Sequence, residues 1–445
     1  VVMSAGNSGY WAENTAPGYL YNDGVSFQMN GTPGSYTNPL TVASVDNGND
    51  AADYKMSAFS SWGVPGSLEL KPEITAPGGM ILSVNGMDPT GTGYEQMSGT
   101  SMAAPQVTGM AALVASHIQS RGLDDQTGLS VRHLAQSLLM STAVPLHNGA
   151  SGGQYYSVLN QGAGLARVDL AAAAESYVMV NGMPDGKVKA ELGEDAERKG
   201  TYTFSFSIHN LNGQAMTYGL SADLFTQDLF SDSNDDLCMD TWTRALDADA
   251  SFFQNGISLE CAGDGFSCDL DGSGTTNAAD ADFLLEYLLG NESELAADGD
   301  VNGDGEVTTY DAHVLLNRLT GAYSVDVPAG GSVTVEVRLE LTEETKEYLN
   351  TDYPAGAYVE GYVFAVPVKE PEAKEAVSHS IPVLGFYGSW SEPSMYDVGG
   401  YLEHTSGAET RIPYLYDVND IRSNFMSVSY GDGYEPRLYV GEEPD

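Results

Sequence analysis

MSGTSMAAP, residues 97–105, is the most informative stretch of this 445-residue chain. It leads into a run of small and apolar residues that predicts a helix over 103–116, apolar almost all round and so expected to pass through a core. A serine at such a helix start lies beside backbone N–H groups that no helical carbonyl can pair, and these groups favour an anion. By itself, a serine at this position is usually only a cap. Pro105 is expected in the first turn, where its missing N–H costs nothing.

Strands and helices alternate on both sides of this stretch. Residues 1–4 and 40–45 are apolar runs typical of buried strands. An amphipathic helix is predicted over 131–142 and an alanine-rich one over 168–176. This alternation indicates an α/β domain over residues 1–178.

The pattern changes after residue 178. Residues 201–209, 332–341 and 358–365 alternate apolar and polar side chains with a period of two, which predicts strands of an antiparallel sandwich. The segment 262–321 interrupts this pattern with loops rich in Asp, Asn and Gly, each followed by a short helix. Residues 391–445, rich in Tyr and Gly, are expected to begin a further β module.

The segment 262–321 contains two loops with one spacing of oxygen ligands. In 269–280 and 300–311, oxygen-bearing side chains fall at positions 1, 3 and 5, glycine at position 6 and a carboxylate at position 12. Position 7 would offer its backbone carbonyl, and position 9 would act directly or through water. The tandem predicts about two bound Ca²⁺ ions. The expected ligands are Asp269, Asp271, Ser273, Thr275, Asn277 and Asp280 in the first loop, and Asp300, Asn302, Asp304, Glu306, Thr308 and Asp311 in the second.

The charge of the chain excludes some classes of partner. Sixty-two acidic residues against 18 basic ones give a formal charge of −44, which repels nucleic acid and anionic lipid. Such a surface suits an exported protein or one that binds hard cations. Three cysteines are too few for a disulfide scaffold, and no apolar run is long enough to span a membrane. Because Val1 and Val2 start within an apolar strand, the chain is expected to be a truncated piece.

Five sequence blocks in order resemble one enzyme family. They are SAGNSG at 4–9, FSSWG at 59–63, KPEITAPGG at 71–79, MSGTSMAAP at 97–105 and GAGL at 162–165. Together they resemble the subtilisin-like serine proteases of the S8 family, especially the cell-envelope branch of the C5a peptidases and lactocepins. The resemblance implies a secreted endopeptidase that works through an acyl-enzyme.

The resemblance also implies roles for particular residues. Ser101 would be the nucleophile, and the Asn7 side chain and the Ser101 backbone N–H would stabilise the oxyanion. The implied substrate-binding residues are Ser4, Ala5, Gly6, Gly99 and Thr100.

The chain departs from the family in two respects. The family's catalytic Asp and His precede the oxyanion Asn, but only six residues precede Asn7 and no His-Gly-Thr context occurs. We therefore expect this chain alone to be inactive. In addition, only residues 46–58 separate the second strand from Phe59, so the protease-associated domain of many envelope proteases is missing and the substrate path is expected to be more open. The histidines, each expected to be a surface or structural residue, are His117, His133, His147, His209, His313, His379 and His404.

The two calcium loops resemble a type I dockerin, because Asp stands at position 12 and no helix precedes the loop. The resemblance implies a cohesin partner and attachment to a larger assembly or a cell surface. Stiffening of the surrounding sandwich by bound calcium is the alternative. The loops differ at positions 10 and 11, Ala278-Ala279 against Thr309-Tyr310, so one orientation on a cohesin is expected to be preferred.

The β region on either side of the module resembles the fibronectin-III-like domain of envelope subtilases. The full expectation is a secreted multidomain protease fragment; the alternative is a non-catalytic protease-like scaffold presented through dockerin–cohesin binding. The predicted divisions are 1–178 for the α/β domain, 179–261 and 322–390 for the sandwich, 262–321 for the dockerin-like insertion and 391–445 for the further β module.

Overall fold

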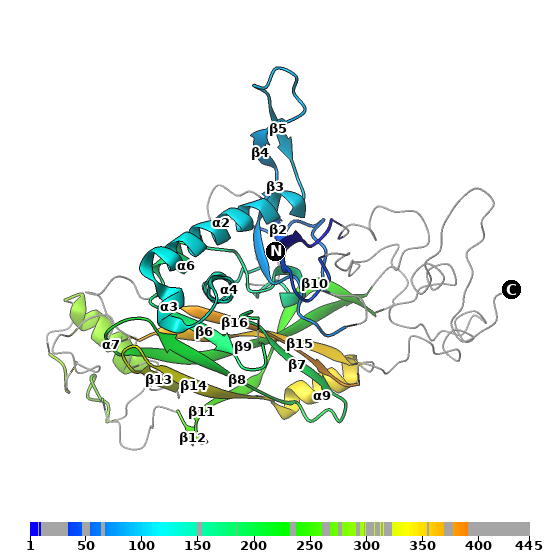
Figure 1. Cartoon of the computed structure of the whole chain (residues 1–445). Coiled ribbons are helices and arrows are strands. Elements are labelled where there is room, and N and C mark those ends of the chain that lie inside the picture. The colour runs from blue at the N-terminus through cyan, green and yellow to red at the C-terminus, as the bar shows by residue number, and fades with distance from the viewer. Residues whose placement is uncertain are drawn as a thin grey trace, which may run out of the picture.

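The computed structural model places the α/β part above a pair of packed sheets (Figure 1). It describes residues 1–7, 9, 34–46, 54–63, 67–148, 154–183, 185–231, 237–259, 268–274, 278–290, 294–297, 299, 307, 312, 315, 323–353, 356–368 and 377–389. The predicted β module over 391–445 lies outside this set, as does the whole calcium loop 300–311 except Val307.

A parallel sheet organises the α/β part, as expected. Its strands β1 (Val2–Ser4), β2 (Leu40–Asp46) and β3 (Ile74–Gly79) lie in the order β1-β2-β3, and both pairings are parallel. All of β2 except its last residue is buried, which accounts for its continuous apolar and small-residue sequence. The carboxyl ends of the three strands therefore lie at one edge of the sheet.

Helix α2 (Thr100–Arg121) packs on β2 and β3 and carries the most informative stretch at its start. The other helices of this part are α3 (Leu123–Thr127), α4 (Val131–Ser141), α5 (Val158–Gln161) and α6 (Val168–Ala173). Gly122, with φ 64°, ends α2 in the left-handed conformation that glycine adopts at low cost. The Ser130 side chain caps α4 by accepting from the His133 backbone N–H.

Two expectations about this helix are wrong. Its buried residues include Ala103, Val107, Val114 and Ile118, which lie on one stripe, so α2 buries one face among the described residues rather than all sides. The opposite face also carries apolar residues, such as the exposed Ala112 and Leu113, and these made the helix look apolar all round in the sequence. Pro105 is the sixth residue of α2, beyond the first turn, so it removes the N–H that would donate to the Ser101 carbonyl.

An unpredicted hairpin joins β3 to α2. Strands β4 (Ile81–Val84) and β5 (Tyr94–Met97) pair in antiparallel fashion and project away from the rest of the molecule (Figure 1). Strand β5 is exposed at every position, and Val84 and Tyr94, which are register partners, are both largely exposed. The strands are too short to produce a recognisable alternation in the sequence.

Two larger sheets form the β part. One is a path β10-β9-β15-β16-β7, with β13 also paired to β9, and the other is the path β12-β11-β14-β8-β6. The strand bounds are β6 (Ser176–Val180), β7 (Ala190–Asp195), β8 (Thr201–Asn210), β9 (Met216–Ser231), β10 (Leu237–Leu246), β11 (Ala248–Gln254), β12 (Ile257–Ser258), β13 (Tyr323–Val327), β14 (Ser332–Leu341), β15 (Ala357–Pro367) and β16 (His379–Tyr387). Helix α9 (Glu343–Asp352) follows β14.

The two sheets pack through a shared hydrophobic core. Strand β14 alternates exposed and buried residues along nearly its whole length, and its buried valines join a cluster with residues of β9, β13 and β15. The predicted period-two strands are therefore present, at β8, β14 and β15. The closer likeness to a fibronectin-III-like domain stays a prediction, because β7 pairs in parallel with β16.

A small separate core holds the inserted module. Helix α7 (Ala278–Leu288) contributes Ala281 and Leu284, which pack with Cys268 and Leu270. This core contains none of the residues of the main one, so the module folds around its own apolar cluster.

Buried polar side chains join the α/β part to the sheets. Glu360 Oε2 accepts from Ser157 Oγ at 2.6 Å and from the Val158 N–H at 2.7 Å. The Tyr362 hydroxyl, two residues along β15, donates to the Gly162 carbonyl at 2.7 Å. The face of β15 that carries Glu360 and Tyr362 is therefore covered by the α5 region. In a sheet with one solvated face, this face of the strand would be exposed to solvent.

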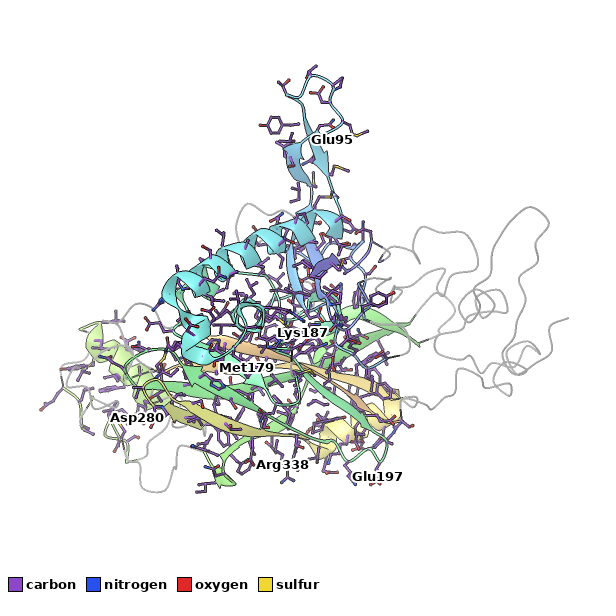
Figure 2. All side chains as sticks on the ribbon, viewed as in Figure 1. Glu95, Met179, Lys187, Glu197, Asp280 and Arg338 are labelled. Atoms are coloured by element: carbon purple, nitrogen blue, oxygen red, sulfur yellow. The ribbon has the colours of Figure 1, made fainter. Side chains whose placement is uncertain are left out.

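A second group of buried charges lies at the same junction. Glu73 Oε1 lies 2.6 Å from Lys71 Nζ, 2.9 Å from Lys187 Nζ and 3.7 Å from Lys189 Nζ, and all four side chains are almost fully buried. Lys189 also pairs with Glu191 at 2.7 Å. The segment that leads into β7 therefore anchors the start of β3 (Lys187 in Figure 2).

Candidate active site and calcium loop

The loop after β1 and the start of α2 are tied together at Thr100. The Gly6 N–H donates to Thr100 Oγ1 at 3.1 Å, and the Thr100 hydroxyl donates to Asn7 Oδ1 at 2.9 Å. The Thr100 backbone N–H also donates to Asn7 Oδ1 at 2.9 Å. Because both of these bonds use the oxygen of the Asn7 amide, the orientation of the amide is fixed and its nitrogen remains as a donor.

The glycines of this turn allow close backbone packing. A Cβ at Gly99 would lie 3.1 Å from Asn7 Nδ2, so the side-chain amide rests against the backbone of Gly99. The Gly99 N–H donates to the Gly78 carbonyl at 2.8 Å, and a Cβ at Gly78 would lie 2.6 Å from the Gly99 oxygen. A larger residue at Gly78 would therefore force the end of β3 away from α2.

Ser101 is the next residue after this anchor. Its side chain is exposed, while Thr100 before it is fully buried. As the second residue of α2, Ser101 has a backbone N–H that lies before the first helical hydrogen bond. The site thus combines one exposed hydroxyl with two N–H donors, at the positive end of a 22-residue helix.

The predicted substrate-binding residues differ in exposure. Ala5, Gly99 and Thr100 are buried, whereas Ser4 and Gly6 are half-buried. The Ala5 N–H donates to the Val42 carbonyl at 2.9 Å, so its backbone donor is used within the sheet. The Thr100 side chain holds Asn7 and points inward. The sequence predicted that Thr100 belongs to the site, but not that its hydroxyl fixes the side chain of Asn7.

Several histidines in the described part of the chain have positions or neighbours that separate them from Ser101. His117 lies 16 residues after Ser101 on α2, about 24 Å along the helix axis. The rings of His147 and His209 lie against Tyr155 and Tyr177. Within the described residues, no histidine is hydrogen-bonded to Ser101. His313 and His404 lie outside them.

His379 illustrates a structural histidine. Its ring lies 2.7 Å from Ser176 Oγ through Nε2 and 3.0 Å from Ser141 Oγ through Nδ1, at the junction of the α/β part and the sheets. Burial lowers the pKa of His379 to about 4, because a charged imidazolium would lose its hydration. The ring is therefore neutral at physiological pH and links the two parts through hydroxyl groups.

The first calcium loop brings three of its predicted ligands together. One carboxylate oxygen each from Asp269, Asp271 and Asp280 lies within 4.8 Å of the others (Asp280 is labelled in Figure 2). Asp280 Oδ1 accepts from the backbone N–H groups of Leu270 at 2.7 Å and Asp271 at 3.1 Å. This fixes the position-12 carboxylate against the start of the loop.

The donor set fits a hard cation. Asp269 Oδ1 is buried and has no hydrogen-bond partner in the described part of the chain, an arrangement that is costly unless a cation satisfies the oxygen. The Gly274 N–H donates to the other oxygen of Asp269 at 2.8 Å. The Ser273 backbone N–H lowers the pKa of Asp271 and so favours the ionised carboxylate that calcium needs. Thr275, Asn277 and all six predicted ligands of the second loop lie outside the described residues.

No helix in the described part of the chain has the length and apolar character needed to cross a membrane.

Two protein-family models match the chain. Residues 1–174 match the Subtilase family, and residues 267–320 match the Dockerin type I domain. Together these matches identify the subtilase and dockerin modules that the sequence blocks and the calcium loops predicted.

Curated relatives match over the same region. The PIII-type proteinase of Lactococcus lactis subsp. cremoris (strain SK11) is 30% identical over 207 residues, which cover 44% of this chain and 10% of the relative. A C5a peptidase of Streptococcus pyogenes serotype M6 is 34% identical over 160 residues, covering 36% of this chain and 13% of the relative. The aligned part of the chain therefore spans only about a tenth of the length of these relatives.

Solved proteases also share sequence with this chain. Sphericase is 28% identical with a TM-score of 0.26, covering 38% of this chain and 47% of its own. The S41 psychrophilic protease is 26% identical with a TM-score of 0.24, covering 38% of this chain and 48% of its own.

Proposed function

We propose that this chain, which carries a subtilase domain over residues 1–174 and a dockerin type I domain over 267–320, is part of a secreted serine endopeptidase whose nucleophile is Ser101. The observation that carries the proposal is the anchor at Thr100, which holds the amide of Asn7 beside the exposed start of α2. A residue that serves only as a helix cap would not need a second chain segment fixed next to it.

The chemistry follows from the donors at this site. The Ser101 hydroxyl would attack the carbonyl carbon of a peptide bond, and the carbonyl oxygen would gain negative charge. Asn7 Nδ2–H and the Ser101 backbone N–H would stabilise that oxyanion. Stabilisation of this kind is usually the largest single contribution to the rate acceleration of acyl transfer. Ser4 and Gly6, half-buried beside Asn7, would line one wall of the substrate cleft.

Activity also requires a general base, which takes the proton from Ser101 Oγ and passes it to the leaving amine, and a carboxylate that orients the base. Since no described histidine contacts Ser101, we propose that the base and its carboxylate come from outside the described residues, and that this chain alone does not hydrolyse peptides.

Labelling with a fluorophosphonate tests the nucleophile. The full-length gene product should be labelled at Ser101, and Ser101→Ala should abolish the label. Ser98→Ala is the matched control, because Ser98 is also exposed and lies three residues away. No labelling of a folded, full-length protein would instead favour the alternative, a non-catalytic protease-like scaffold.

We further propose that the module binds about two calcium ions and attaches the protein to a cohesin. The first loop supplies the support, through its three converging carboxylates and the buried Asp269 oxygen. Asp269, Asp271 and Asp280 would hold one ion, with Ser273 at position 5, and the second loop would hold the other. A bound ion neutralises these carboxylates and fixes the helix that a cohesin would contact.

Calorimetric titration of the whole chain with Ca²⁺ tests this proposal. About two sites are expected, and Asp280→Asn should remove one of them. Asp282→Asn is the control, since Asp282 lies on the same helix but is exposed. Absence of binding heat at millimolar calcium would overturn the metal proposal, whereas calcium binding without cohesin binding would leave a purely stiffening role.

The domain division belongs to the same proposal. We place a catalytic part at 1–178, a fibronectin-III-like support at 179–261 and 322–390, the module at 262–321 and a further β module at 391–445. The buried links of β15 and Lys187 to the catalytic part support a positioning role for the sheets. The acidic composition and the dockerin module support a location outside the cell.

A further inference from the structure

A notch interrupts one edge of strand β9. Along this edge β13 pairs with residues 216–220 and β10 pairs with residues 224–231. Residues 221–223 between them have no strand partner on this side in the described part of the chain. After Leu246, the chain leaves β10 through Asp247 and enters β11 in the opposite sheet.

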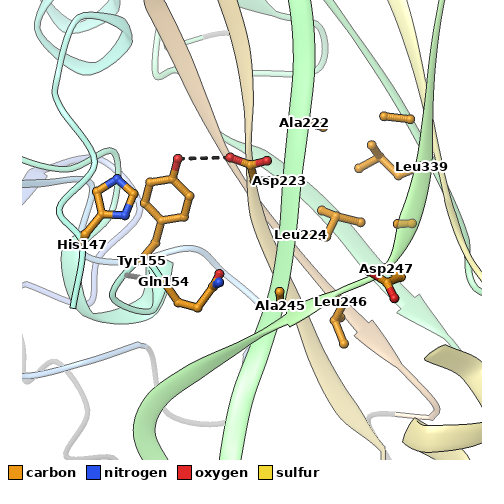
Figure 3. Close-up of a pocket in the computed structure, with 12 residues that line it drawn as sticks. His147, Gln154, Tyr155, Ala222, Asp223, Leu224, Ala245, Leu246, Asp247 and Leu339 are labelled. Carbon is orange, nitrogen blue, oxygen red and sulfur yellow. Dashed lines mark hydrogen bonds between the residues drawn. The ribbon is translucent and has the colours of Figure 1, made fainter. Parts of the chain in front are cut away.

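A cavity of about 360 Å³ occupies this notch. Its apolar floor is made by Leu224, Leu246 and Leu339, which are buried. The walls include four alanines, whose short side chains leave the space open (Figure 3). They are Ala222, Ala245, Ala248 and Ala250. The volume is within the range of sites that hold a small ligand or one large side chain.

The rim of the cavity is polar and acidic. Asp223 and Asp247 are exposed, and Asp223 Oδ2 accepts from the Tyr155 hydroxyl at 3.1 Å (Figure 3). This bond fixes one carboxylate oxygen. The centroid of the His147 ring lies 4.2 Å from that of Tyr155, so the ring that donates to Asp223 is itself packed against a second ring. No lysine or arginine is among the residues that line the cavity.

We propose that this cavity binds a primary ammonium or guanidinium group carried on an unbranched apolar stem. The stem would lie against the alanine walls, and the cationic head would lie at Asp223 on the rim. An anion would be repelled by the rim carboxylates and by the −44 charge of the chain, and a neutral apolar ligand would leave the carboxylates partly desolvated without compensation. The side chains of lysine and arginine in a protein have this chemistry, and so do free alkyl amines.

The site is independent of the protease proposal. Its lining comes from the sheets and from His147, Gln154 and Tyr155, and includes neither Ser101 nor Asn7. The Tyr155 carbonyl accepts from the Thr243 hydroxyl, which attaches Tyr155 to β10. The cavity is thus built jointly by the α/β part and the β part, and an occupant would touch both.

Titration of the whole chain with matched probes, followed by saturation-transfer NMR, tests the proposal. Pentylamine should bind at least about tenfold more tightly than pentan-1-ol, and pentanoate should not bind. The peptides acetyl-Gly-Lys-Gly-amide and acetyl-Gly-norleucine-Gly-amide distinguish a protein side chain from a free alkyl amine as the source of the ligand group. Binding of the lysine peptide supports a protein side chain as the ligand, and binding of pentylamine alone supports a free amine.

Variants locate the binding. Asp223→Asn keeps the size of the side chain and an acceptor for Tyr155, and should weaken pentylamine binding about tenfold. Asp326→Asn, at an exposed position on β13, is the matched control and should change nothing. Ala245→Phe should fill the mouth and exclude every probe; if it does not fold by circular dichroism, the Asp223 and Asp326 pair still decides. Equal binding of amine and alcohol, an unchanged affinity in Asp223→Asn, or no binding of any probe at millimolar concentration would each overturn the proposal.

Discussion

Glu73 and Glu360 are both fully buried where the α/β part meets the sheets, yet their surroundings differ in charge. Glu73 lies within 4 Å of three lysine ammonium groups. Glu360 accepts hydrogen bonds only from neutral groups, and its second oxygen has no partner in the described part of the chain. The two buried carboxylates therefore differ in whether neighbouring charges compensate their burial.

The two environments have opposite consequences for stability. Burial raises the pKa of Glu360 to about 7, because desolvation outweighs the hydrogen bonds from Ser157 and Val158. At Glu73 the ion cluster links two segments distant in sequence, and Glu73 is the counterion that its three lysines share, while Lys189 also pairs with Glu191. Glu73 should hold the junction together, whereas Glu360 should weaken it at alkaline pH.

Replacing Glu73 should have the largest effect. Glu73→Gln would leave the buried lysines without their shared counterion and should lower the free energy of unfolding by about 3–5 kcal/mol. Urea unfolding at pH 7 measures the change. Glu336→Gln, on the exposed face of β14, is the control and should shift stability by less than about 0.5 kcal/mol. An equal effect of both variants on the free energy of unfolding would show that the buried ion cluster does not contribute to stability.

Replacing Glu360 should act in the opposite direction and depend on pH. Below pH 4.5 both the folded and unfolded states hold the proton. Between pH 4.5 and about 7 only the folded state keeps it, so the free energy of unfolding falls as pH rises. Relative to its effect at pH 4.5, Glu360→Gln should therefore add about 1–3 kcal/mol of stability at pH 8. A wild-type minus variant difference that is flat between these two pH values contradicts this account.

His379 should produce an acid-side effect at the same junction. Since its pKa is lowered to about 4, the unfolded state binds the proton first as pH falls below 6.5, and stability is lost between 6.5 and 4. About 2 kcal/mol should be lost between pH 6.5 and 5, and His379→Gln should flatten this slope. Thermal unfolding across this range, with His133→Gln as the control at the half-buried start of α4, measures it. The same acid slope in wild type and His379→Gln would assign the loss to other groups.

The smallest effect is expected at an exposed ion pair. Arg167 and Asp169 lie 2.6 Å apart with both side chains more than a third exposed. Asp169→Asn should cost about 0.2–1 kcal/mol, and 1 M salt should remove most of that difference while leaving the effect of Glu73→Gln. Denaturation at low and high salt compares the two. If salt reduced both effects equally, the Glu73 cluster would have to be hydrated.

The sequence predicted the α/β part and the closeness of Asn7 to the start of α2, because the signals for both are local. The parallel strands and the period-two strands of the sheets follow from apolar patterns, and the blocks around Asn7 and Ser101 are dense enough to place both residues in one site. The first calcium loop could also be predicted from the sequence, since the spacing of its expected ligands lies within 12 consecutive positions. These features depend on short segments of chain.

The junction could not be predicted because its partners are distant. Lys187 and Glu73 are 114 residues apart, and Lys187, Lys189 and Glu191 alternate in a way that is typical of a solvated strand face. Glu360 lies in a similar alternating pattern, between Tyr358 and Tyr362, so the sequence predicts that its side chain is exposed to solvent. Only the covering of this face by the α5 region buries it, and that contact has no local signature.

The role of Asn7 as an oxyanion donor is the claim on which the functional account depends. Peptide hydrolysis by the full-length gene product, compared between wild type and Asn7→Ala, tests it most directly. The account predicts that kcat falls about 10²–10³-fold with little change in KM, a magnitude established on subtilisin for loss of one oxyanion donor. An unchanged kcat in a folded Asn7→Ala protein would contradict it.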